Sequence, residues 1–339
     1  MSVKITGIGI AVPDRVVTND EIAQRLGVDP AWIEVRTGIR ERRHVGPDES
    51  TSTLGARAAE AALACAGRTA DEVDVLIVGT CTSDYVFPST ATVIQQAIGA
   101  HSAGAFDLGA ACSGFIYSLA VGAGLTRGGG AGRVLVVGVD VLSRFTNLDD
   151  PITAPLFGDG AGAVMLEADE SATPMTFDLR ADGSGEDKVL IPAGGARRPA
   201  THETVDQRLH TIHMQGREVY RSAVRQMTAL GVRLGADGFD LLIAHQANKR
   251  IIDETAAHLG VPQEKIYLNI DRYGNTSAAS IPIGMHEAWE TGRLKPGDRL
   301  LLIAFGAGYT YAGAVVPWTL PYPTPALAAA AKPQVPVVT

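Results

Sequence analysis

Val75-Leu76-Ile77-Val78 is the first of four short apolar runs in the sequence; the others are Val134-Leu135-Val136-Val137, Leu241-Leu242-Ile243-Ala244 and Leu300-Leu301-Leu302-Ile303. Each run is flanked by Gly, Asp or Arg, which is typical of a short strand covered on both faces. The second run follows the first by 59 residues, the fourth follows the third by 59, and the later pair follows the earlier pair by 166. These matching intervals predict two similar α/β halves.

Segments with helical periodicity lie around the apolar runs. Thr18-Asn19-Asp20-Glu21 has the pattern of a capped helix start with acidic residues in the first turn. Further helices are predicted at 52–66, 113–126, 216–234, 248–259 and 277–291. The alternation of strands and helices predicts parallel sheets with helices packed on them.

The repeat also aligns two loops. Gly109-Ala110-Ala111-Cys112 precedes the helix of the first half, and Gly274-Asn275-Thr276-Ser277 precedes the equivalent helix of the second half, 165 residues later. If the halves pack about a pseudo-twofold axis, both loops face one central site. We therefore expect Cys112 and Asn275 to lie close together.

The chain of 339 residues is predicted to contain an N-terminal half (1–172), a C-terminal half (173–320) and a flexible, Pro- and Ala-rich tail (321–339). With 46% hydrophobic and 19% charged residues, it has the composition of a folded protein. No apolar run approaches the length of a membrane span, and no targeting segment is evident at the N-terminus.

The net charge and the cysteines argue against several classes of partner and site. A net charge of −8 argues against nucleic acid as a partner, because phosphate binding needs a basic face. The three cysteines, Cys65, Cys81 and Cys112, form neither a disulfide framework nor a Cys/His metal cluster, so we expect no metal site and a reducing, cytoplasmic location.

Cys112 is a candidate nucleophile. It sits among small residues at the start of an apolar helix, where the positive end of the helix dipole is expected to lower the pKa of the thiol. The alternative is a small core residue, which is the commoner role of a Cys in a Gly/Ala-rich segment.

Three other segments are candidates for the same site. His245 directly follows an expected strand, where α/β sheets place their sites, although such a His can also cap the next helix. Asn275 lies in a loop that could equally be a plain turn. The segment Phe305-Gly306-Ala307-Gly308 follows the last apolar run and could offer a backbone N–H to an oxyanion.

Together these motifs resemble β-ketoacyl-acyl carrier protein synthase III, a condensing enzyme of the thiolase superfamily. The resemblance runs from about Val3 to Trp318 and rests on several motifs in order: Trp32-Ile33, Arg36 to Arg43, Gly109 to Phe115, Phe157 to Gly162, His245 to Asn248, Gly274 to Ser280 and Phe305 to Gly308. It implies a thiolase-like α/β fold, in which two duplicated βαβαβ halves form an α-β-α-β-α layered arrangement.

The resemblance also implies a Cys-His-Asn site that needs no cofactor. Cys112 would take the acyl group from an acyl-CoA primer, and His245 and Asn275 would donate hydrogen bonds to the enolate that malonyl-acyl carrier protein forms on losing CO2. The backbone N–H groups of Cys112 and Ala307 would hold the tetrahedral oxyanion.

Substrate contacts follow from the same resemblance. Trp32, Arg36 and Asn248 would bind CoA. The alternative for Trp32 is a side chain packed in the core, and the alternative for Lys249, in the next group, is a solvated helix face. The loop residues Gln246, Ala247, Asn248, Lys249 and Arg250 would meet the acidic acyl carrier protein. Phe305 and Phe87 would line the primer pocket, Phe87 from the partner subunit of a homodimer.

One segment departs from the family pattern. Asp149-Asp150-Pro151 stands where relatives often have Asp-Arg-Gly, so the Arg that would cover the CoA adenine opposite Trp32 is missing. The irregular segment 182–213 is expected near the mouth of the pocket and raises the same question about the acyl donor.

Four alternatives follow from these motifs. A thiolase would use a second cysteine in its C-terminal half, and none follows Cys112; a non-catalytic partner subunit would have lost Cys112 itself. Gly158-Asp159-Gly160-Ala161-Gly162 does not have the spacing of a dinucleotide-binding loop. The closest rival is an acyltransferase of secondary metabolism on the same fold, which loads or transfers an unusual acyl group.

Overall fold

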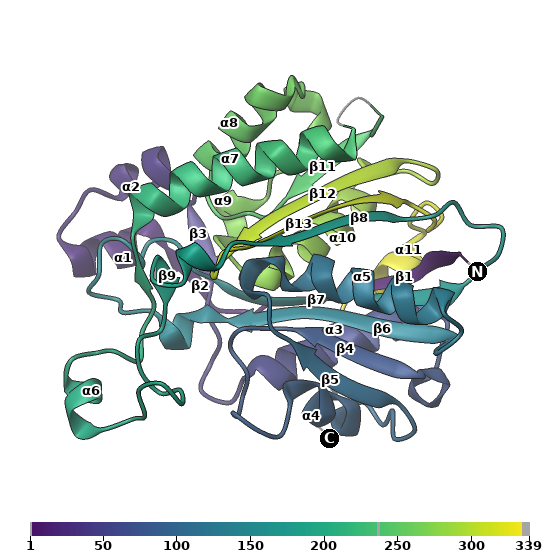
Figure 1. Cartoon of the computed structure of the whole chain (residues 1–339), viewed down its shortest axis with the longest axis horizontal. Helices are drawn as coiled ribbons and strands as arrows, with labels where there is room; N and C mark the ends of the chain where they lie inside the picture. The colour runs from purple at the N-terminus through teal and green to yellow at the C-terminus, as the bar shows by residue number, and fades with distance from the viewer. Residues whose placement is uncertain (1, 236–237, 334–339) are drawn as a thin grey trace.

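A computed structural model describes residues 2–235 and 238–333. Two sheets form its framework (Figure 1). The first has the strand order β1-β7-β6-β4-β5. Its strands are β1 (Val3–Ala11), β4 (Val75–Gly79), β5 (Gly104–Leu108), β6 (Arg133–Val141) and β7 (Asp159–Ala168). The second has the order β11-β12-β13-β8, with β8 (Thr176–Ala181), β11 (Leu241–Ala244), β12 (Arg299–Gly306) and β13 (Thr310–Pro317).

All four apolar runs form buried strands, as predicted. The equivalent pairs β4–β6 and β11–β12 are parallel. The prediction of purely parallel sheets is wrong, because β1 and β7 pair antiparallel in the first sheet and β12, β13 and β8 do so in the second. β12 and β13 are joined by a short turn, and β6 and β7 by a segment without an α-helix, so the alternation of strands and helices did not reveal these antiparallel pairs.

Helices form three layers around the two sheets (Figure 1). The outer face of the first sheet is covered by α3 (Thr51–Ala66) and α4 (Thr90–Ala97), and that of the second by α7 (Gly216–Leu234), which packs beside α8 (Lys249–Leu259). Between the sheets lie α5 (Gly114–Arg127) and α10 (Ser280–Glu290). The order is therefore α-β-α-β-α, the thiolase-like arrangement that the motifs implied. No helix among the described residues is long and apolar enough to cross a membrane.

The central layer holds the largest apolar core. Phe115 and Leu119 of α5 and Trp289 of α10 are fully buried there, in contact with residues of both sheets. Because a fully buried aromatic or leucine side chain stabilises the fold by about 1.5–3 kcal/mol, this shared core holds the two halves together. It also fixes the N-termini of α5 and α10, which lie beside the site described below.

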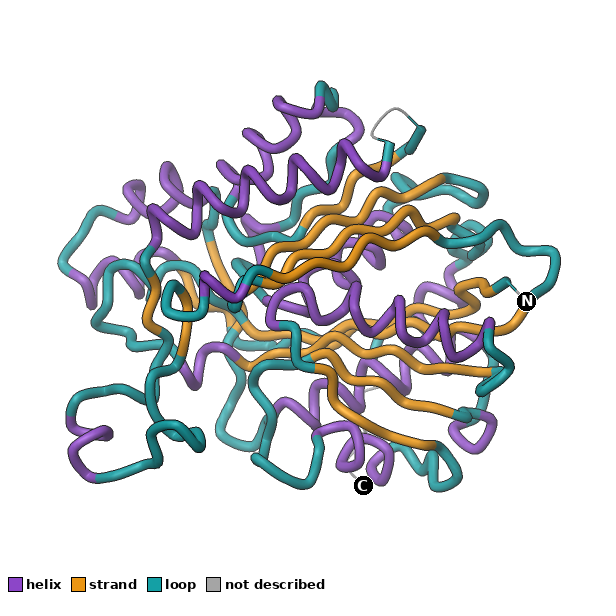
Figure 2. Tube along the Cα trace, viewed as in Figure 1, coloured by secondary structure: helices purple, strands orange, loops and turns teal. Residues whose placement is uncertain are grey.

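The remaining elements lie at the edges of this framework. A subdomain with a small hydrophobic cluster contains α1 (Asn19–Leu26), α2 (Pro30–Thr37) and the antiparallel pair of β2 (Val16–Thr18) and β3 (Glu41–Arg43). The irregular segment after β8 contains β9 (Val189–Leu190), α6 (His202–Asp206) and β10 (His213–Met214), and α9 (Ile270–Tyr273) precedes the Asn275 loop. Figure 2 shows that the segment around α6 is mostly loop.

The expected flexible tail differs in the structure. Residues Pro325–Ala330 form a short helix, α11, which packs against α3, and Ala331 is fully buried. The Nε1–H of Trp289 donates to the carbonyl of Pro321 at 2.7 Å. The prediction of a flexible tail is therefore wrong for 321–333, because small apolar side chains of this segment pack against α3. Residues 334–339 lie outside the described part of the chain.

Candidate active site

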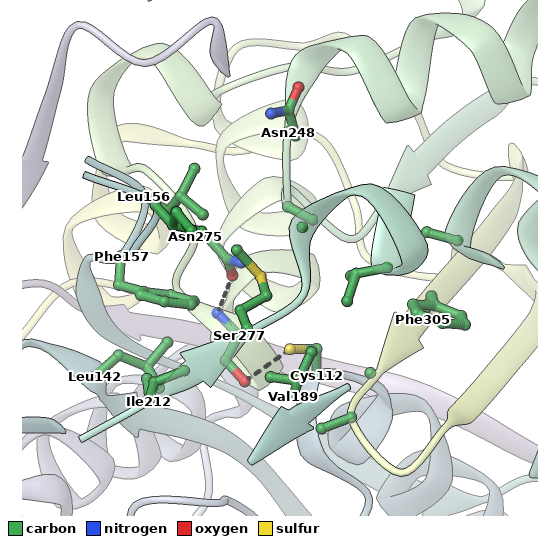
Figure 3. A pocket seen from close by; sticks show the side chains of 18 of the residues that line it. Cys112, Leu142, Leu156, Phe157, Val189, Ile212, Asn248, Asn275, Ser277 and Phe305 are labelled. Atoms are coloured by element: carbon green, nitrogen blue, oxygen red, sulfur yellow. Dashed lines mark hydrogen bonds between the residues drawn. The ribbon is translucent and has the colours of Figure 1, made fainter. Parts of the chain in front are cut away.

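A cavity of about 520 Å³ lies where the two halves meet. Cys112, Asn275, Ser277 and Asn248 line it (Figure 3). His245 also belongs to its wall. Most of the remaining wall is apolar, including Leu142, Leu156, Phe157, Val189, Ile212 and Phe305. Such a cavity, with a few polar groups at one place in an apolar wall, is the usual form of a small-molecule site.

Two strained residues shape the polar part of the cavity. Ala111 has a φ of 46° and Ser277 a φ of 50°, and both therefore occupy the left-handed region that non-glycine residues rarely adopt. They are 166 residues apart, so they are equivalent positions of the repeat. Each begins a short 3-10 turn, Ala111–Ser113 or Ser277–Ala279, and the two turns contact each other at the N-termini of α5 and α10. The backbone strain is thus concentrated where the halves meet.

The thiol of Cys112 is in a less activating environment than its sequence position suggested. Burial raises its pKa to about 12, against the effect of the Ser277 hydroxyl, which lowers it; the Asp140 carboxylate raises it further. The prediction of a lowered pKa is therefore wrong, because the burial of the thiolate away from water outweighs the hydrogen bonds that stabilise it.

His245 is held by a serine that the sequence analysis did not single out. Its Nδ1 lies 2.8 Å from Oγ of Ser280, which also accepts a hydrogen bond from the backbone N–H of Gln246 at 3.3 Å. We assign the Ser280 proton to Nδ1, the acceptor within its reach, so that Nε2 carries the imidazole hydrogen. Burial lowers the pKa of His245 to about 3, so the ring is neutral at neutral pH and offers a donor without a charge.

The side chain of Asn275 is oriented by its own loop. Its Oδ1 accepts the backbone N–H of Ser277 at 2.9 Å, which leaves the amide NH2 as the free end (Figure 3). The backbone on either side is fixed to the first half: Asn275 N–H donates to Leu156, and Gly158 N–H donates to Asn275. The structure thus places a donor group of the second half against a loop of the first.

Trp32, Arg36 and Asn248 line the cavity together with Pro151 and Ile152. The guanidinium of Arg36 lies 4.6 Å from the centre of the Trp32 ring. Asn248 caps α8 by accepting the N–H of Arg250 at 2.9 Å, and its Nδ2 donates to the carbonyl of Arg36 at 3.1 Å. Asn248 therefore ties α8 to α2, and its side chain is already partly satisfied.

Asp149, next to the position of the missing Arg, is part of an ion-pair cluster. Its carboxylate pairs with Arg25 at 2.7 Å and with Arg208 at 2.6 Å, and these two guanidinium groups lower its pKa to about 2. Arg208 belongs to the irregular segment 182–213. This segment also contributes Val189, Leu190, Ile191 and Ile212 to the cavity wall, as its expected position near the pocket implied.

The loop after His245 is only partly available to a partner. Gln246 is 1% exposed, and its side-chain amide donates to the carbonyl of Ala244 at 2.7 Å. It cannot meet a carrier protein, so the prediction for Gln246 is wrong; a buried structural amide and a surface one look alike in sequence. Lys249 pairs with Asp253 at 2.6 Å, Arg250 is exposed over the ring of Tyr220, and Ala247 lines the cavity.

The remaining expected residues fall into two groups. Phe305 and Ala307 line the cavity, Phe305 with its ring centre 4.7 Å from that of Tyr309. Phe87 is 85% exposed and is not among the residues that line the cavity of its own chain. The sequence analysis missed Ser277, Ser280 and Cys81, although the first two lie within the quoted motif Gly274 to Ser280 and could have been found there.

Among the described residues, no group of three or more His, Cys, Asp or Glu side chains is arranged to hold a metal ion. Around Cys112 the cavity wall offers a thiol, an imidazole, an amide and a hydroxyl, from Cys112, His245, Asn275 and Ser277, a set suited to acyl transfer with neutral hydrogen-bond donors.

Comparison with known proteins agrees with this arrangement. Residues 106–183 match the family model for 3-oxoacyl-[acyl-carrier-protein] synthase III, and residues 232–318 match the model for its C-terminal part. A β-ketoacyl-[acyl-carrier-protein] synthase III of Roseiflexus sp. (strain RS-1) is 49% identical over 322 residues, covering 93% of this chain and 98% of that protein.

Solved structures give the same result. The synthase III of Aquifex aeolicus VF5 superposes with a TM-score of 0.86 at 37% identity, covering 93% of this chain and 100% of the other. The priming β-ketosynthase of the R1128 polyketide biosynthetic pathway superposes with a TM-score of 0.87 at 32% identity, covering 94% and 97%. The fold, the cavity and these likenesses together show that the chain belongs to the β-ketoacyl-[acyl-carrier-protein] synthase III family of condensing enzymes.

Proposed function

We propose that the protein catalyses the decarboxylative condensation of an acyl-CoA primer with malonyl-acyl carrier protein to give a 3-oxoacyl-acyl carrier protein. The observation that carries this proposal is a single apolar cavity whose wall combines the Cys112 thiol with the oriented His245 ring and Asn275 amide. We further propose that the reaction needs no metal or cofactor and takes place in the cytoplasm.

In the first step, Sγ of Cys112 attacks the thioester carbon of the primer. A carbon–sulfur bond to the enzyme forms, the bond to CoA breaks, and CoA leaves with the electron pair and takes up a proton. Because the pKa of the free thiol is raised to about 12, the attack needs the thiolate to be stabilised within the site. We assign the oxyanion of the tetrahedral intermediate to the backbone N–H groups of Cys112 and Ala307.

In the second step, the malonyl group loses CO2, and the electron pair of the broken carbon–carbon bond moves into an enolate. Nε2–H of His245 and the NH2 of Asn275 donate hydrogen bonds to the enolate oxygen. A His with a pKa lowered to about 3 suits this role, because it stays neutral and keeps its proton. Removing one donor of this kind typically costs about 10²–10³ in rate.

In the third step, the enolate carbon attacks the acyl carbon on Cys112. A new carbon–carbon bond forms, the carbon–sulfur bond breaks, and the electron pair returns to Sγ. The released 3-oxoacyl group remains on the carrier protein, and Cys112 is restored for the next primer.

We assign CoA binding to Trp32, Arg36 and Asn248, and carrier-protein binding to Ala247, Asn248, Lys249 and Arg250. A basic rim can attract an acidic carrier despite a net charge of −8, because local fields steer the encounter. Because segment 149–151 lacks the expected Arg, the adenine is expected to meet an apolar surface of Pro151 and Ile152 opposite Trp32.

We also propose a homodimer. Tyr85, Val86 and Phe87 form an apolar tip with exposed fractions of 60%, 92% and 85%. Three consecutive exposed apolar side chains are costly in water and are typical of a surface that a partner covers. Phe87 would then enter the primer pocket of the partner subunit.

A second candidate is a priming synthase or acyltransferase of secondary metabolism. Two observations favour it: the expected Arg contact to CoA is missing from segment 149–151, and segment 182–213 adds four apolar side chains to the cavity wall. Both would change the choice of acyl donor while leaving the chemistry of Cys112 intact.

Intact-protein mass spectrometry separates the two candidates. The protein is incubated with a panel of acyl-CoA primers, and then with malonyl-carrier protein or with other acceptors. We expect an acyl adduct that Cys112→Ala cannot form and a 3-oxoacyl-carrier product. An adduct that transfers to another acceptor without loss of CO2 would contradict the condensation and support the acyltransferase.

A further inference from the structure

Ser277 touches the reacting atom of the site. Its hydroxyl donates a hydrogen bond to Sγ of Cys112 at 3.4 Å (Figure 3), and the residue is fully buried. Of the sequence motifs, only Asn275 was expected to act from this loop, so the hydroxyl has no role in the mechanism above. A donor aimed at sulfur lowers the pKa of the thiol, as it does here against the effect of burial.

A second thiol lies on the other side of the same hydroxyl. Sγ of Cys81 is 3.8 Å from Oγ of Ser277, and Cys81 also lines the cavity. Cys81 borders the cavity, where desolvation by the surrounding wall and the neighbouring carboxylate of Asp140 raise the pKa of its thiol well above the usual range. Cys81 is therefore protonated at neutral pH. A protonated thiol can donate to Ser277 and leave the serine proton for Cys112.

The other acceptor near Cys81, the carboxylate of Asp140, already accepts several hydrogen bonds. Asp140 is fully buried; its Oδ1 accepts from the Cys81 backbone N–H at 2.8 Å and from two threonine hydroxyls, and its Oδ2 accepts from Ala278 N–H at 3.2 Å. These four donors occupy most of the acceptor positions of the carboxylate. Ser277 is the other acceptor within reach of the Cys81 thiol, at 3.8 Å, so we assign the order of donation Cys81, Ser277, Cys112.

The backbone of Ser277 explains how one residue serves two groups. Its φ of 50° is sterically unfavourable for a side chain, yet here its N–H reaches Oδ1 of Asn275 while its hydroxyl reaches Cys112. Strain of this kind costs about 1–3 kcal/mol and persists where the surrounding structure enforces it. The strained residue thus couples the orientation of Asn275 to a contact with the sulfur.

We propose that Ser277 is a catalytic residue whose hydroxyl, polarised by the Cys81 thiol, stabilises the thiolate of Cys112 both as nucleophile and as leaving group. In the first step the hydroxyl lowers the barrier to forming the bond between Sγ and the thioester carbon. In the third step it stabilises the electron pair that returns to Sγ. The hydroxyl keeps its own proton throughout. The inference rests on the proposed function only in taking Cys112 as the nucleophile.

The test measures the reactivity of the sulfur without any substrate. Iodoacetamide alkylation of Cys112 is followed from pH 7 to pH 10 by peptide mass spectrometry, which separates Cys112 from Cys81. In Ser277→Ala we expect the rate at pH 8 to fall about ten-fold or more and the profile to move to higher pH, since a hydrogen bond to a charged group is lost. An unchanged rate and profile would overturn the proposal.

Ser277→Gly serves as the second variant, because glycine adopts a φ of 50° without strain and keeps the N–H that holds Asn275. It is expected to lose reactivity as Ser277→Ala does; wild-type reactivity in the glycine variant would show that only the backbone matters and would overturn the proposal. Cys81→Ala is expected to lower the alkylation rate of Cys112 by less than Ser277→Ala does. A larger decrease than in Ser277→Ala would overturn the hydrogen-bond order Cys81, Ser277, Cys112.

Ser113→Ala is the matched control. Ser113 adjoins Cys112 and is equally buried, but its hydroxyl donates to the carbonyl of Thr310 at 3.2 Å rather than to sulfur. Its alkylation profile should match that of the wild type, and a loss equal to that of Ser277→Ala would count against a specific role. Failure of an acyl-CoA to label the wild-type protein would contradict the proposed function but would leave the alkylation result intact.

Discussion

Gly306 passes so close to Cys112 that a Cβ on the glycine would lie 2.8 Å from the backbone nitrogen of the cysteine. The same atom would lie 2.9 Å from Oγ1 of Thr310 and 3.2 Å from the carbonyl of Ala110. The end of strand β12 in the second half is therefore in direct contact with the loop that holds Cys112 in the first.

Gly306→Ala is expected to displace Cys112 and to slow acylation by about 10²-fold, since displacements near 1 Å have effects of this size. The measurement is the rate of acyl-enzyme formation by mass spectrometry. Gly124→Ala is the control, because Gly124 is exposed in α5 and a Cβ there meets nothing within 4 Å. It should leave acylation unchanged and raise the stability by about 0.5–1 kcal/mol; equal acylation in both variants would contradict the close contact.

His245→Ala and Asn275→Ala are expected to form the acyl-enzyme but to lose about 10²–10³ in the rate of malonyl decarboxylation, because each removes one donor to the enolate. The release of labelled CO2 from malonyl-carrier protein measures this step separately from acylation. Normal condensation in both variants would remove these two residues from the site.

Ser280→Ala removes the hydroxyl that holds Nδ1 of His245 at 2.8 Å. The ring can then take either tautomer, so decarboxylation is expected to fall about ten-fold, within the range seen when a supporting hydrogen bond to a site His is lost. Acylation of Cys112 should be unaffected. Ser280→Thr, which keeps a hydroxyl, should recover part of the rate, and no difference between Ala and Thr would argue against the tautomer assignment.

Phe87→Ala is expected to broaden the range of primers, because a large ring would be removed from the partner's pocket. The product profile across a series of acyl-CoA chain lengths measures this. Sedimentation at working concentration provides the accompanying check: a species near the mass of one chain would exclude the dimer, and an unchanged chain-length profile would exclude the gate.

The stability is expected to fall as the pH drops from 6.5 to 5. Burial lowers the pKa of His44 to about 4, of His245 to about 3 and of His286 to about 4, so over this range the unfolded chain binds protons that the folded protein does not. Over this range each histidine lowers the free energy of unfolding by about 2 kcal/mol. Asp159, whose pKa burial raises to about 6, increases it by about 1 kcal/mol. Urea unfolding at the two pH values measures the change, and His245→Gln should reduce it.

Much of the framework could be predicted from the sequence, because buried strands such as Val75–Gly79 and Leu241–Ala244 are continuous apolar runs and recur at a fixed interval. The antiparallel strands were less evident: β7 begins with Asp159-Gly160-Ala161-Gly162, whose glycines allow α10 to approach and hide the strand pattern. Local periodicity does not reveal a residue's surroundings, which is also why α11 was missed.

The candidate site, like the fold, could be predicted only in part from the sequence. The motifs identified Cys112, His245 and Asn275, which the fold brings to one cavity. They did not reveal that burial would raise the pKa of Cys112 or that Gln246 would be inaccessible, because both depend on contacts between segments far apart in the chain. Ser277 and Ser280 were in view within one motif, but only the distances distinguish them from ordinary turn residues.

The alignment of Ala111 with Ser277 also accounts for the single reaction centre that we propose for a chain with two duplicated halves. At the same interval of 166 residues, Cys112 corresponds to Ala278, Asn275 to Gly109 and His245 to Gly79. Gly79 has no room for an imidazole, since even a Cβ would lie 2.7 Å from the carbonyl carbon of Gly114. In the mechanism that we propose, the two halves are therefore complementary: the first supplies the thiol that binds the acyl group and the second supplies the hydrogen-bond donors. Neither half can regain a complete set by a single substitution.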